Sequence, residues 1–305
     1  MNNNINMPED FPSMETLMDK IQDTLAFSWS IKDFNECNIQ SWLNNFTGEV
    51  LPVDIEKRIA LWLLRNYTYY NQKEIEHLCK DLYKRYIHLI ATSEHLDKKG
   101  LLKKMKNLCY LPLGSASESG GLIAYEFRKQ AKIGIDRFFY PTTDMDDFYG
   151  SIIAFIDDVT LSATQAKKPI EEFMHKNKLD SVYLLTLIAS NQAIMELNKV
   201  NIKTVACIEI DDRDKCFSGN SIAFYKYPSL LKPAKEMCAH YGQKIYPCYP
   251  LGYMDGQYLF GFYYNTPNNS LPIFWSSANQ WQPIFERKGK IKNDARVWKT
   301  FEKFI

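Results

Sequence analysis

Residues 152–165 constrain the fold of this chain more than any other segment. They begin with an apolar run, Ile152 to Ile156, which is typical of a buried strand. Two adjacent carboxylates follow, Asp157 and Asp158, then a short hydroxyl-rich loop, and then an amphipathic segment that continues to about Lys178. Strand, acids, loop and helix in immediate succession predict one repeating unit of an open α/β sheet.

This order of elements places carboxylates beside a site that favours anions. Ligands of open α/β sheets bind at the carboxyl ends of the strands, where the next helix presents unpaired N–H groups and a partial positive charge. Carboxylates accept hydrogen bonds from sugar hydroxyls and hold divalent metal ions, whereas they do not bind phosphate. We therefore expect a sugar phosphate, because its hydroxyls and its phosphate group suit the two halves of the segment.

The segment resembles the loop that binds phosphoribosyl pyrophosphate (PRPP) in type I phosphoribosyltransferases. The resemblance rests on four apolar residues, the acid pair, three spacers and residues 162–165. It implies that Asp157 and Asp158 are the catalytic residues, contact the ribose 2′- and 3′-hydroxyls and take part indirectly in binding Mg²⁺. It also implies that the loop cradles the 5′-phosphate with Ser162, Ala163, Thr164 and Gln165.

Two positions depart from the common pattern of that family, which is Thr-Gly-x-Thr after the spacers. Ala163 stands in place of the glycine and Gln165 in place of the final threonine. A residue with a Cβ disfavours a left-handed backbone by roughly 1 kcal/mol. We therefore expect Ala163 to oppose such a conformation and the phosphate contact to be weaker than the family pattern provides.

A second loop of small residues, 111–121, follows the short apolar run 108–113. Its place upstream of the acid pair is where type I phosphoribosyltransferases carry the loop for the pyrophosphate leaving group. The resemblance implies this role for Ser117, Ser119, Gly120 and Arg128. The alternative is an ordinary Gly-rich turn before a helix whose basic residues are solvated.

A third segment, residues 263–275, contains the sequence NTPNN. Together with the two loops it resembles a subgroup of phosphoribosyltransferase-like proteins encoded in bacterial conflict and anti-phage loci, which implies an effector, toxic when released, of antiviral defence. The candidates for contact with a base are Asn265, Asn268, Asn269 and Trp275. The alternatives are a turn for the asparagines and core packing for the tryptophan.

Composition excludes several other classes of protein. With 305 residues, 46% of them hydrophobic, the chain exceeds the usual size of one domain, and we expect one and a half to two packed domains. A net charge of +1 indicates no overall field for nucleic acid or for a membrane surface. No apolar run reaches the roughly 20 residues that span a bilayer. The cysteines form no C-x-x-C pair and the start resembles no signal peptide, so we expect a cytoplasmic protein with reduced thiols.

The order of the expected elements predicts an α/β fold. Residues 1–105 have helical periodicity, and we expect an N-terminal helical subdomain. Residues 106–305 alternate strands and helices, which predicts a parallel sheet flanked by helices, as in the phosphoribosyltransferase-like domain that the resemblance implies. From about residue 228 prolines are frequent, and we expect a C-terminal hood over the strand ends. The expected strands of the sheet are 108–113, 152–156, 181–188 and 204–210.

The acid pair also has a plainer interpretation. Asp157 and Asp158 suit a strand end followed by a helix cap. Asp211 and Asp212 repeat the pattern of a strand followed by acids. There we expect a solvated strand end, and the alternative is a pair of metal ligands. The five histidines lack a spacing such as H-E-x-x-H, so we expect no zinc chemistry. The sequence contains no P-loop, dinucleotide-binding or nucleophile-elbow motif.

Three functions remain open. The first is a phosphoribosyltransferase-like effector that acts on PRPP, a nucleotide or NAD, in which the acid pair favours an oxocarbenium-like sugar and Mg²⁺ neutralises the leaving group. The second is a sensor that binds a nucleotide through the same site without catalysis. The third is a housekeeping transferase. The helical subdomain is free to contact a regulatory protein, a nucleoprotein or a second copy of the chain, and no membrane contact is expected.

Overall fold

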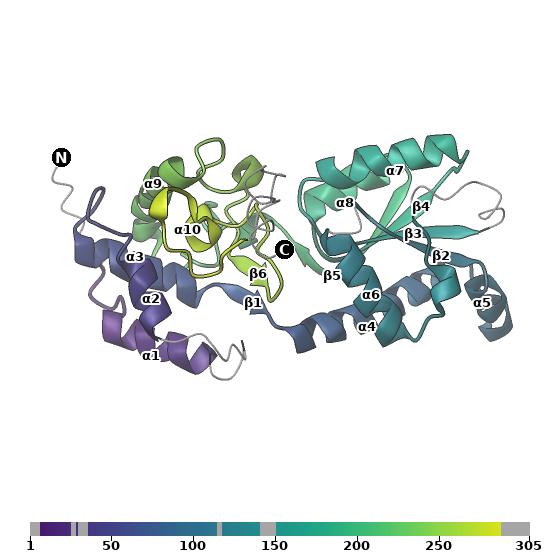
Figure 1. The fold of residues 1–305 in the computed structure, drawn as a ribbon, viewed down its shortest axis with the longest axis horizontal. Helices are drawn as coiled ribbons and strands as arrows, with labels where there is room; N and C mark the ends of the chain where they lie inside the picture. Colours follow the sequence, from purple (N-terminus) through teal and green to yellow (C-terminus); the bar gives the residue numbers. More distant parts are fainter. Residues whose placement is uncertain (1–6, 26–28, 30–35, 115–117, 141–150, 288–305) are drawn as a thin grey trace, which may run out of the picture. The chain divides into compact units, whose positions relative to one another are not determined.

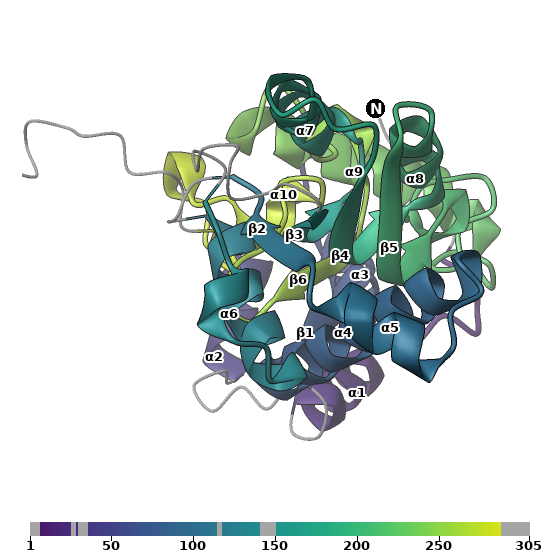
Figure 2. The same cartoon turned by 90° about the vertical axis from the view of Figure 1, so that its right-hand side faces the viewer.

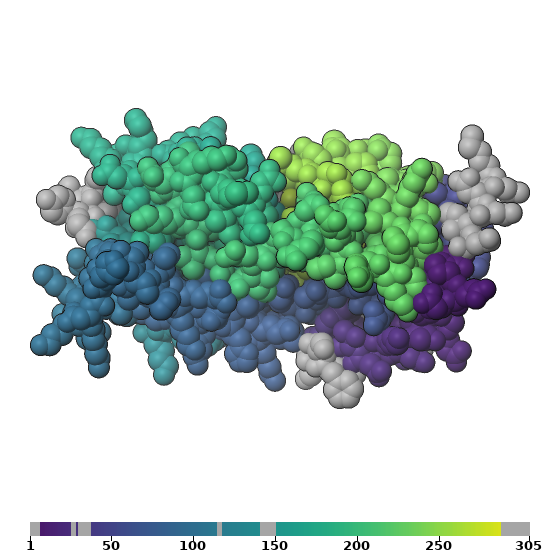
Figure 3. All heavy atoms as spheres, turned by 180° about the vertical axis from the view of Figure 1, so that it is seen from behind, coloured from purple at the N-terminus to yellow at the C-terminus, as the bar shows by residue number. Residues whose placement is uncertain are grey.

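The computed structural model describes residues 7–25, 29, 36–114, 118–140 and 151–287. Contacts between residues divide the chain into two compact units. Unit 1 comprises residues 1–69 and 226–305, and unit 2 comprises residues 70–225. The first and the last described segments of the chain, purple and yellow in Figure 3, therefore contribute to one unit, and the middle of the chain builds the other.

Unit 2 is built on a four-stranded parallel sheet. Its strands lie in the order in which they occur along the chain (Figure 2). They are β2 (Leu108–Pro112), β3 (Ile152–Thr160), β4 (Val182–Ser190) and β5 (Ile202–Ile210). Phe155 on β3 pairs with Leu111 on β2 and with Leu184 on β4. Parallel pairing places the carboxyl ends of all four strands at one edge of the sheet, so loops that follow different strands meet there.

Helices cover both faces of this sheet (Figure 1). On one face the apolar side chains of α7 and α8 pack against the strands in a single cluster that includes Phe155, Ile170 and Leu197. On the other face Phe127 of α6 and Tyr86 of α4 pack around Tyr110 of β2. The helices of unit 2 are α4 (Gln72–Ser93), α5 (Lys98–Met105), α6 (Ser119–Ala131), α7 (Thr164–Lys176) and α8 (Asn191–Asn198).

The connections explain why α6 and α7 lie on opposite faces. After α6, Phe138 forms a parallel bridge with Tyr110 on the side of β2 that does not face β3, so the connection from β2 through α6 leads to the outer edge of the sheet. The connection from β3 through α7 to β4 runs in the opposite direction. Right-handed crossovers that run in opposite directions put their helices on opposite faces.

Unit 1 combines helices from both ends of the chain with a two-stranded sheet. Its core is aromatic: Trp42 stacks on Phe274 with ring centroids 5.2 Å apart, and its Nε1 donates a hydrogen bond of 2.7 Å to Ile273 O. The strands are β1 (Thr68–Tyr70), at the boundary of the unit, and β6 (Phe260–Phe262). The α-helices are α1 (Met14–Thr24), α2 (Glu36–Leu43), α3 (Val53–Arg65), α9 (Pro228–Ile245) and α10 (Pro272–Trp275).

The sequence prediction of an α/β fold with a parallel sheet flanked by helices is confirmed, and the predicted strands differ from the observed ones mainly at their ends. The division of the chain differs from the expected boundary at residue 105. The reason is that α4 buries the apolar stripe Ile75, Cys79, Leu82, Tyr86 and Ile90 and packs against α6, β4 and β5 of unit 2. Within the described residues, no helix is long and apolar enough to cross a membrane.

Candidate functional site

The acid pair lies inside β3, not directly after it. We expected the strand to end at Ile156, but its ladder to β4 continues through Val159, opposite Ile188, and Thr160, opposite Ala189. Val159 and Thr160 are β-branched, and such residues suit a pleated strand. Because β4 extends to Ser190 beside them, the two strands project together beyond the acids.

The carboxyl groups of Asp157 and Asp158 interact with one another. Asp158 is 6% exposed and Asp157 partly exposed, and each carboxyl accepts the N–H of the next residue, at 2.9 and 2.8 Å. Burial, then the charge and the hydrogen bond of the Asp158 carboxyl, and to a lesser degree the charge of Glu118, raise the pKa of Asp157 well above its usual range. Two neighbouring carboxylates ionise together only at a cost, which favours protonation of one of them.

The loop after β3 adopts the conformation that its sequence disfavours. Ala163 has φ 58° and ψ −26°, which is left-handed, although we expected its side chain to oppose that state. From there the chain enters α7 directly: Lys167 N donates to Ala163 O at 2.8 Å, and Thr164 N donates to Ser162 O at 2.7 Å. The backbone thus keeps a turn suited to glycine where the phosphoribosyltransferase pattern has one.

This turn puts the first turn of α7 directly after β3, at the carboxyl edge of the sheet. The first N–H groups of a helix lack partners within the helix and attract anions. The side chains of Thr164 and Gln165 are exposed, Ser162 is partly exposed and Ala163 is buried. Among the four predicted phosphate residues, three thus present polar side chains to solvent and the fourth packs inward.

Sequence reasoning missed two hydroxyl groups beside this loop. Ser190 Oγ, at the end of β4, donates to Leu161 O at 2.7 Å and accepts from Ala193 N at 3.0 Å, so it joins the loop to the start of α8. Thr160 Oγ1 is buried without a hydrogen-bond partner among the described residues. Thr160 lies two positions after Asp158, which puts both side chains on one face of β3. In the sequence, each of these two groups is indicated by a hydroxyl residue at the end of a strand.

The second predicted loop begins where β2 ends, next to β3. Leu113 N donates to Ile156 O at 2.8 Å. A Cβ atom on Gly120 would collide with Leu113 O and would stand 3.1 Å from Ile156 O. Gly120 therefore permits the start of α6 to approach the residue before Asp157. Ser119 is the first residue of α6, and Ser117 lies outside the described residues.

Arg128 is not at this loop. It lies in the last turn of α6, nine positions after Ser119, which is about 13 Å along a helix. There its guanidinium stacks on the Tyr125 ring, 5.5 Å from the ring centroid. The backbone of α6 runs away from the carboxyl edge over this distance, and a contact of Arg128 with a leaving group stays a prediction.

A comparison with known families agrees with this geometry. The profile of the PRTase-CE family matches residues 39–287, which is most of the chain. The protein belongs to the PRTase-CE family. It is thus phosphoribosyltransferase-like, as the acid pair and its loop predicted.

Other comparisons add little. No curated protein matches the chain. Among solved structures it is similar to a Leishmania donovani UMP synthase, with a TM-score of 0.31 and 13% identity, over 68% of this chain and 42% of that one. The match covers less than half of the length of that protein, and a likeness this distant carries no conclusion about function.

The matched region of this PRTase-CE protein includes the predicted base-contacting residues, which belong to unit 1. Asn265 closes a tight turn with Phe262, and its Oδ1 accepts from Thr266 N at 3.0 Å. Asn269 Nδ2 donates to Tyr253 O at 3.1 Å, and Asn268 O accepts from Tyr253 N at 2.7 Å. These bonds match the plainer interpretation of the NTPNN sequence as a turn.

Trp275, the fourth predicted base-contacting residue, has a structural role as well. It is buried, its Nε1 donates to Ser270 O at 2.9 Å, and its ring packs against Tyr246 with centroids 5.1 Å apart. The structure does not bring the acid pair and this group together in one unit, and a contact with a base remains a prediction.

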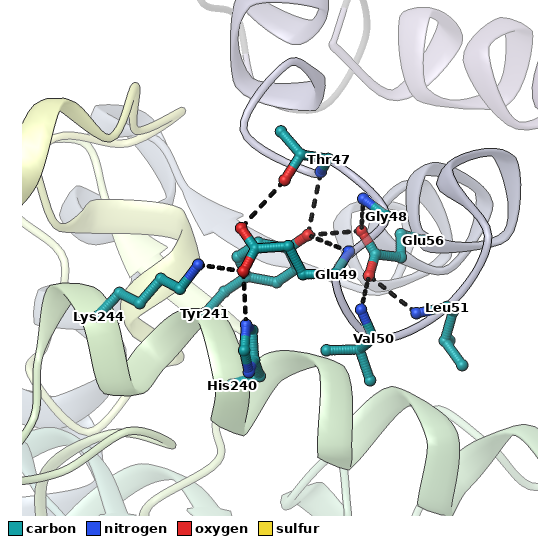
Figure 4. A network of polar contacts seen from close by, with 9 residues as sticks. All are labelled: Thr47, Gly48, Glu49, Val50, Leu51, Glu56, His240, Tyr241 and Lys244. Carbon is teal, nitrogen blue, oxygen red and sulfur yellow. Dashed lines mark hydrogen bonds and ion pairs between the residues drawn. The ribbon is translucent and has the colours of Figure 1, made fainter. Parts of the chain in front are cut away.

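A polar network in unit 1 escaped the sequence analysis altogether (Figure 4). Glu56 of α3 is fully buried, and its carboxyl accepts hydrogen bonds from Gly48 N, Val50 N and Leu51 N at 2.8 to 3.1 Å. Tyr241 of α9 donates to it at 2.6 Å. The carboxyl thereby orders the loop 47–51 and joins it to a helix far away in the sequence. A lone Glu in an amphipathic helix gave no signal for this role.

Beside this carboxyl, Glu49 extends to the surface of α9. His240 Nε2 lies 3.0 Å from Glu49 Oε2, and Lys244 Nζ bonds to the same oxygen. The bonds to Lys244 and then to His240 lower the pKa of Glu49 to about 2. The three side chains are between 40% and 45% exposed, so solvent screens the ion pairs and they contribute little to stability. The arrangement is best explained as an anchor for the loop.

Proposed function

We propose that the carboxyl edge of the unit 2 sheet binds the ribose 5-phosphate part of PRPP, of a nucleotide or of NAD. Asp157 and Asp158 hold the ribose hydroxyls, and the loop Ser162–Gln165 with the first turn of α7 holds the phosphate. Membership of the PRTase-CE family supports the choice of ligand class. The protein is, in this proposal, an effector of a bacterial anti-phage system.

The observation that carries the proposal is the left-handed backbone of Ala163. Such a conformation costs an Ala roughly 1 kcal/mol, and helices that start after strands do not need it. Strained residues concentrate at sites that hold a ligand, and Ala163 lies between the acid pair and the N-terminus of α7. Glycine at this position would relieve the strain. The chain has an alanine there and adopts the left-handed conformation all the same.

The acid pair supplies suitable chemistry for pentosyl transfer. Breaking the bond between ribose C1′ and its leaving group develops positive charge on the sugar, which a nearby carboxylate stabilises. A ligand diol accepts and donates hydrogen bonds, so it suits a pair of carboxyls that shares a proton. No covalent nucleophile is required in this scheme.

Mg²⁺ is compatible with the site if it arrives with the ligand. Among the described residues, no group of three or more His, Cys, Asp or Glu side chains is arranged to hold a metal ion. Mg²⁺ in phosphate-processing sites is usually held by one or two carboxylates and by the phosphates of the substrate. Asp157 and Asp158 supply that protein share, and the ion would neutralise charge on the leaving group.

Metabolite turnover tests the proposal directly. The purified full chain is incubated with PRPP, NAD and nucleotides in the presence of Mg²⁺, and their loss is followed by mass spectrometry. Binding of ribose 5-phosphate is measured by calorimetry. The double variant Asp157→Asn with Asp158→Asn is expected to lose turnover and to bind ribose 5-phosphate at least about tenfold more weakly, since it loses the charge of the pair and the hydrogen bonds that this charge strengthens.

The matched control is Glu171→Gln with Glu172→Gln, which neutralises two adjacent acids on α7, away from its N-terminus. It should leave binding and turnover unchanged. The proposal is wrong if ribose 5-phosphate fails to bind, or if the two double variants behave alike. In cells, the defence role predicts that phage plating efficiency rises when the acid pair of the native locus is neutralised.

A sensor is the second candidate, and the two departures in the loop favour it. Ala163 and Gln165 replace residues of the phosphoribosyltransferase pattern, so binding without catalysis is consistent with the same site. A sensor binds ribose 5-phosphate and shows no turnover before or after substitution, whereas a housekeeping transferase turns over PRPP with a base.

We propose that the first 105 residues carry the contact with a regulator, a nucleoprotein or a second copy of the chain.

A further inference from the structure

Glu118 lies at the N-terminus of α6, where the resemblance to type I phosphoribosyltransferases implies a site for the leaving group. It is the N-cap residue of α6, with φ −96° and ψ 169°, and its side chain makes no capping hydrogen bond to the helix. It is partly exposed. An acid is therefore at the positive end of α6, and the basic residues Arg128 and Lys129 lie in the last turn, at the other end.

The side chain of Glu118 folds back over the start of the loop. A Cβ atom on Gly114, whose φ is 86°, would collide with Glu118 Oε2 and would stand 3.4 Å from its Cδ. The carboxyl group therefore covers the left-handed turn that ends β2. The positive φ of Gly114 favours glycine at this position.

The carboxyl of Glu118 is also close to the acid pair. Gly120, two positions later, touches the carbonyl groups of Leu113 and Ile156, and Asp157 follows Ile156 directly. The negative charge of Glu118 accordingly contributes to the raised pKa of Asp157. Three carboxyl groups thus converge around the ends of β2 and β3.

A carboxylate at a helix N-terminus interacts with the partial positive charge that an anion would otherwise bind. Pyrophosphate brings several negative charges and would meet Glu118 there, with like-charge repulsion. A neutral or cationic base meets no such repulsion. Resting on the proposed function, we propose that Glu118 is a specificity-determining residue that excludes pyrophosphate and selects N-glycosides of ribose 5-phosphate, that is, nucleotides, over PRPP.

The corresponding reaction is hydrolysis of a nucleotide. The bond between C1′ and the base nitrogen breaks, and its electron pair goes to the nitrogen. The oxygen of water forms the new bond to C1′ on the sugar, and one water proton goes to the base. The products are ribose 5-phosphate and a free base, and no oxidant or reductant is needed.

Calorimetry with pyrophosphate and with ribose 5-phosphate tests the role of Glu118. The full chain and the variants Glu118→Gln, Glu118→Asp and Glu172→Gln are compared, each with and without Mg²⁺. Removing the charge in Glu118→Gln is expected to raise pyrophosphate affinity about tenfold, the effect of relieving one close like-charge contact. Glu118→Asp keeps the charge and should behave as the parent, as should Glu172→Gln on the surface of α7.

Two results would overturn the proposal. One is that Glu118→Gln binds pyrophosphate no better than the parent in either condition. The other is that it loses pyrophosphate affinity with Mg²⁺ present, because Glu118 would then help to bind a metal–pyrophosphate complex. Thermal unfolding checks that the variants are folded, and Glu118→Asp supplies a charge-retaining comparison in case Glu118→Gln is unstable.

The outcomes for this proposal and for the proposed function are separable. Ribose 5-phosphate affinity reports on the acid pair and the α7 loop, and Glu118→Gln should change it by less than about threefold because that phosphate lies at the other helix. Pyrophosphate affinity reports on Glu118 whether or not ribose 5-phosphate binds. If the protein binds ribose 5-phosphate and Glu118→Gln does not change pyrophosphate affinity, the proposed function stands and the role of Glu118 is refuted.

Discussion

Ser190 Oγ donates a hydrogen bond of 2.7 Å to the carbonyl oxygen of Leu161. The same oxygen accepts Ala193 N at 3.0 Å as the N-cap of α8. One hydroxyl group therefore fixes the loop after β3 to the neighbouring strand and helix, 29 residues along the chain. The loop that we propose to bind phosphate is thus fixed by a residue that lies outside the loop, on β4.

Ser190→Ala should weaken both stability and ligand binding. Loss of a helix N-cap costs about 1 kcal/mol, and the loop loses its tie to β4. The control Ser13→Ala removes the N-cap of α1, where Ser13 Oγ accepts from Thr16 N at 3.1 Å. Urea unfolding should show a similar loss in both variants. Calorimetry with ribose 5-phosphate should show weaker binding only for Ser190→Ala, and equal binding would refute the role of this bond in the loop.

Ala163→Gly should change stability little, because two effects oppose one another. Glycine relieves the left-handed strain of roughly 1 kcal/mol, but the methyl group of Ala163 is buried in the core cluster of unit 2, and a lost methyl costs about 0.8 kcal/mol. Lys132 is also left-handed, with φ 54°, and is exposed, so Lys132→Gly should stabilise by up to about 1 kcal/mol. Thermal unfolding distinguishes the two, and a large loss of stability for Ala163→Gly would contradict this balance.

Asp157→Asn should stabilise the protein at neutral pH. The pKa of Asp157 is raised in the folded state above the usual 3.8, so between the two values the folded protein binds more protons than the unfolded chain. Stability therefore falls as pH rises above 3.8, by up to about 1.4 kcal/mol per pH unit, until the folded pKa is passed. The variant lacks this decline. Unfolding free energies measured from acid to neutral pH should converge in acid and diverge toward neutral pH, and parallel curves would contradict the raised pKa.

Glu56→Gln should be strongly destabilising. The carboxyl accepts three backbone N–H groups and one tyrosine hydroxyl while fully buried, and an amide nitrogen would face donors there. Losses of about 3 kcal/mol or more are typical for a broken buried charge network. Tyr241→Phe removes one donor and should cost about 1 to 2 kcal/mol. Urea unfolding measures both, and an equal effect of the two variants would show that the loop 47–51 does not depend on the carboxyl.

Local sequence pattern predicted much of unit 2. The strands β2 to β5 are apolar runs with helical periodicity between them, and such patterns depend on neighbours within a few residues. The predicted end of β3 is too early, because two adjacent acids indicate the end of a strand, whereas pairing with β4 continues past them. Pairing with another strand outweighed the local signal.

The sequence by itself determined the α/β class, the acid pair and the loop that follows it, since these are contiguous residues whose chemistry and spacing are readable along the chain. Only the tertiary structure decided that both chain ends form one unit, that Ala163 is left-handed, and that Glu118, Ser190 and Glu56 meet their partners. Glu56 and Tyr241 are 185 residues apart. Contacts at such separations form when packing brings distant segments together, and no periodicity or spacing in one segment records its partner in another.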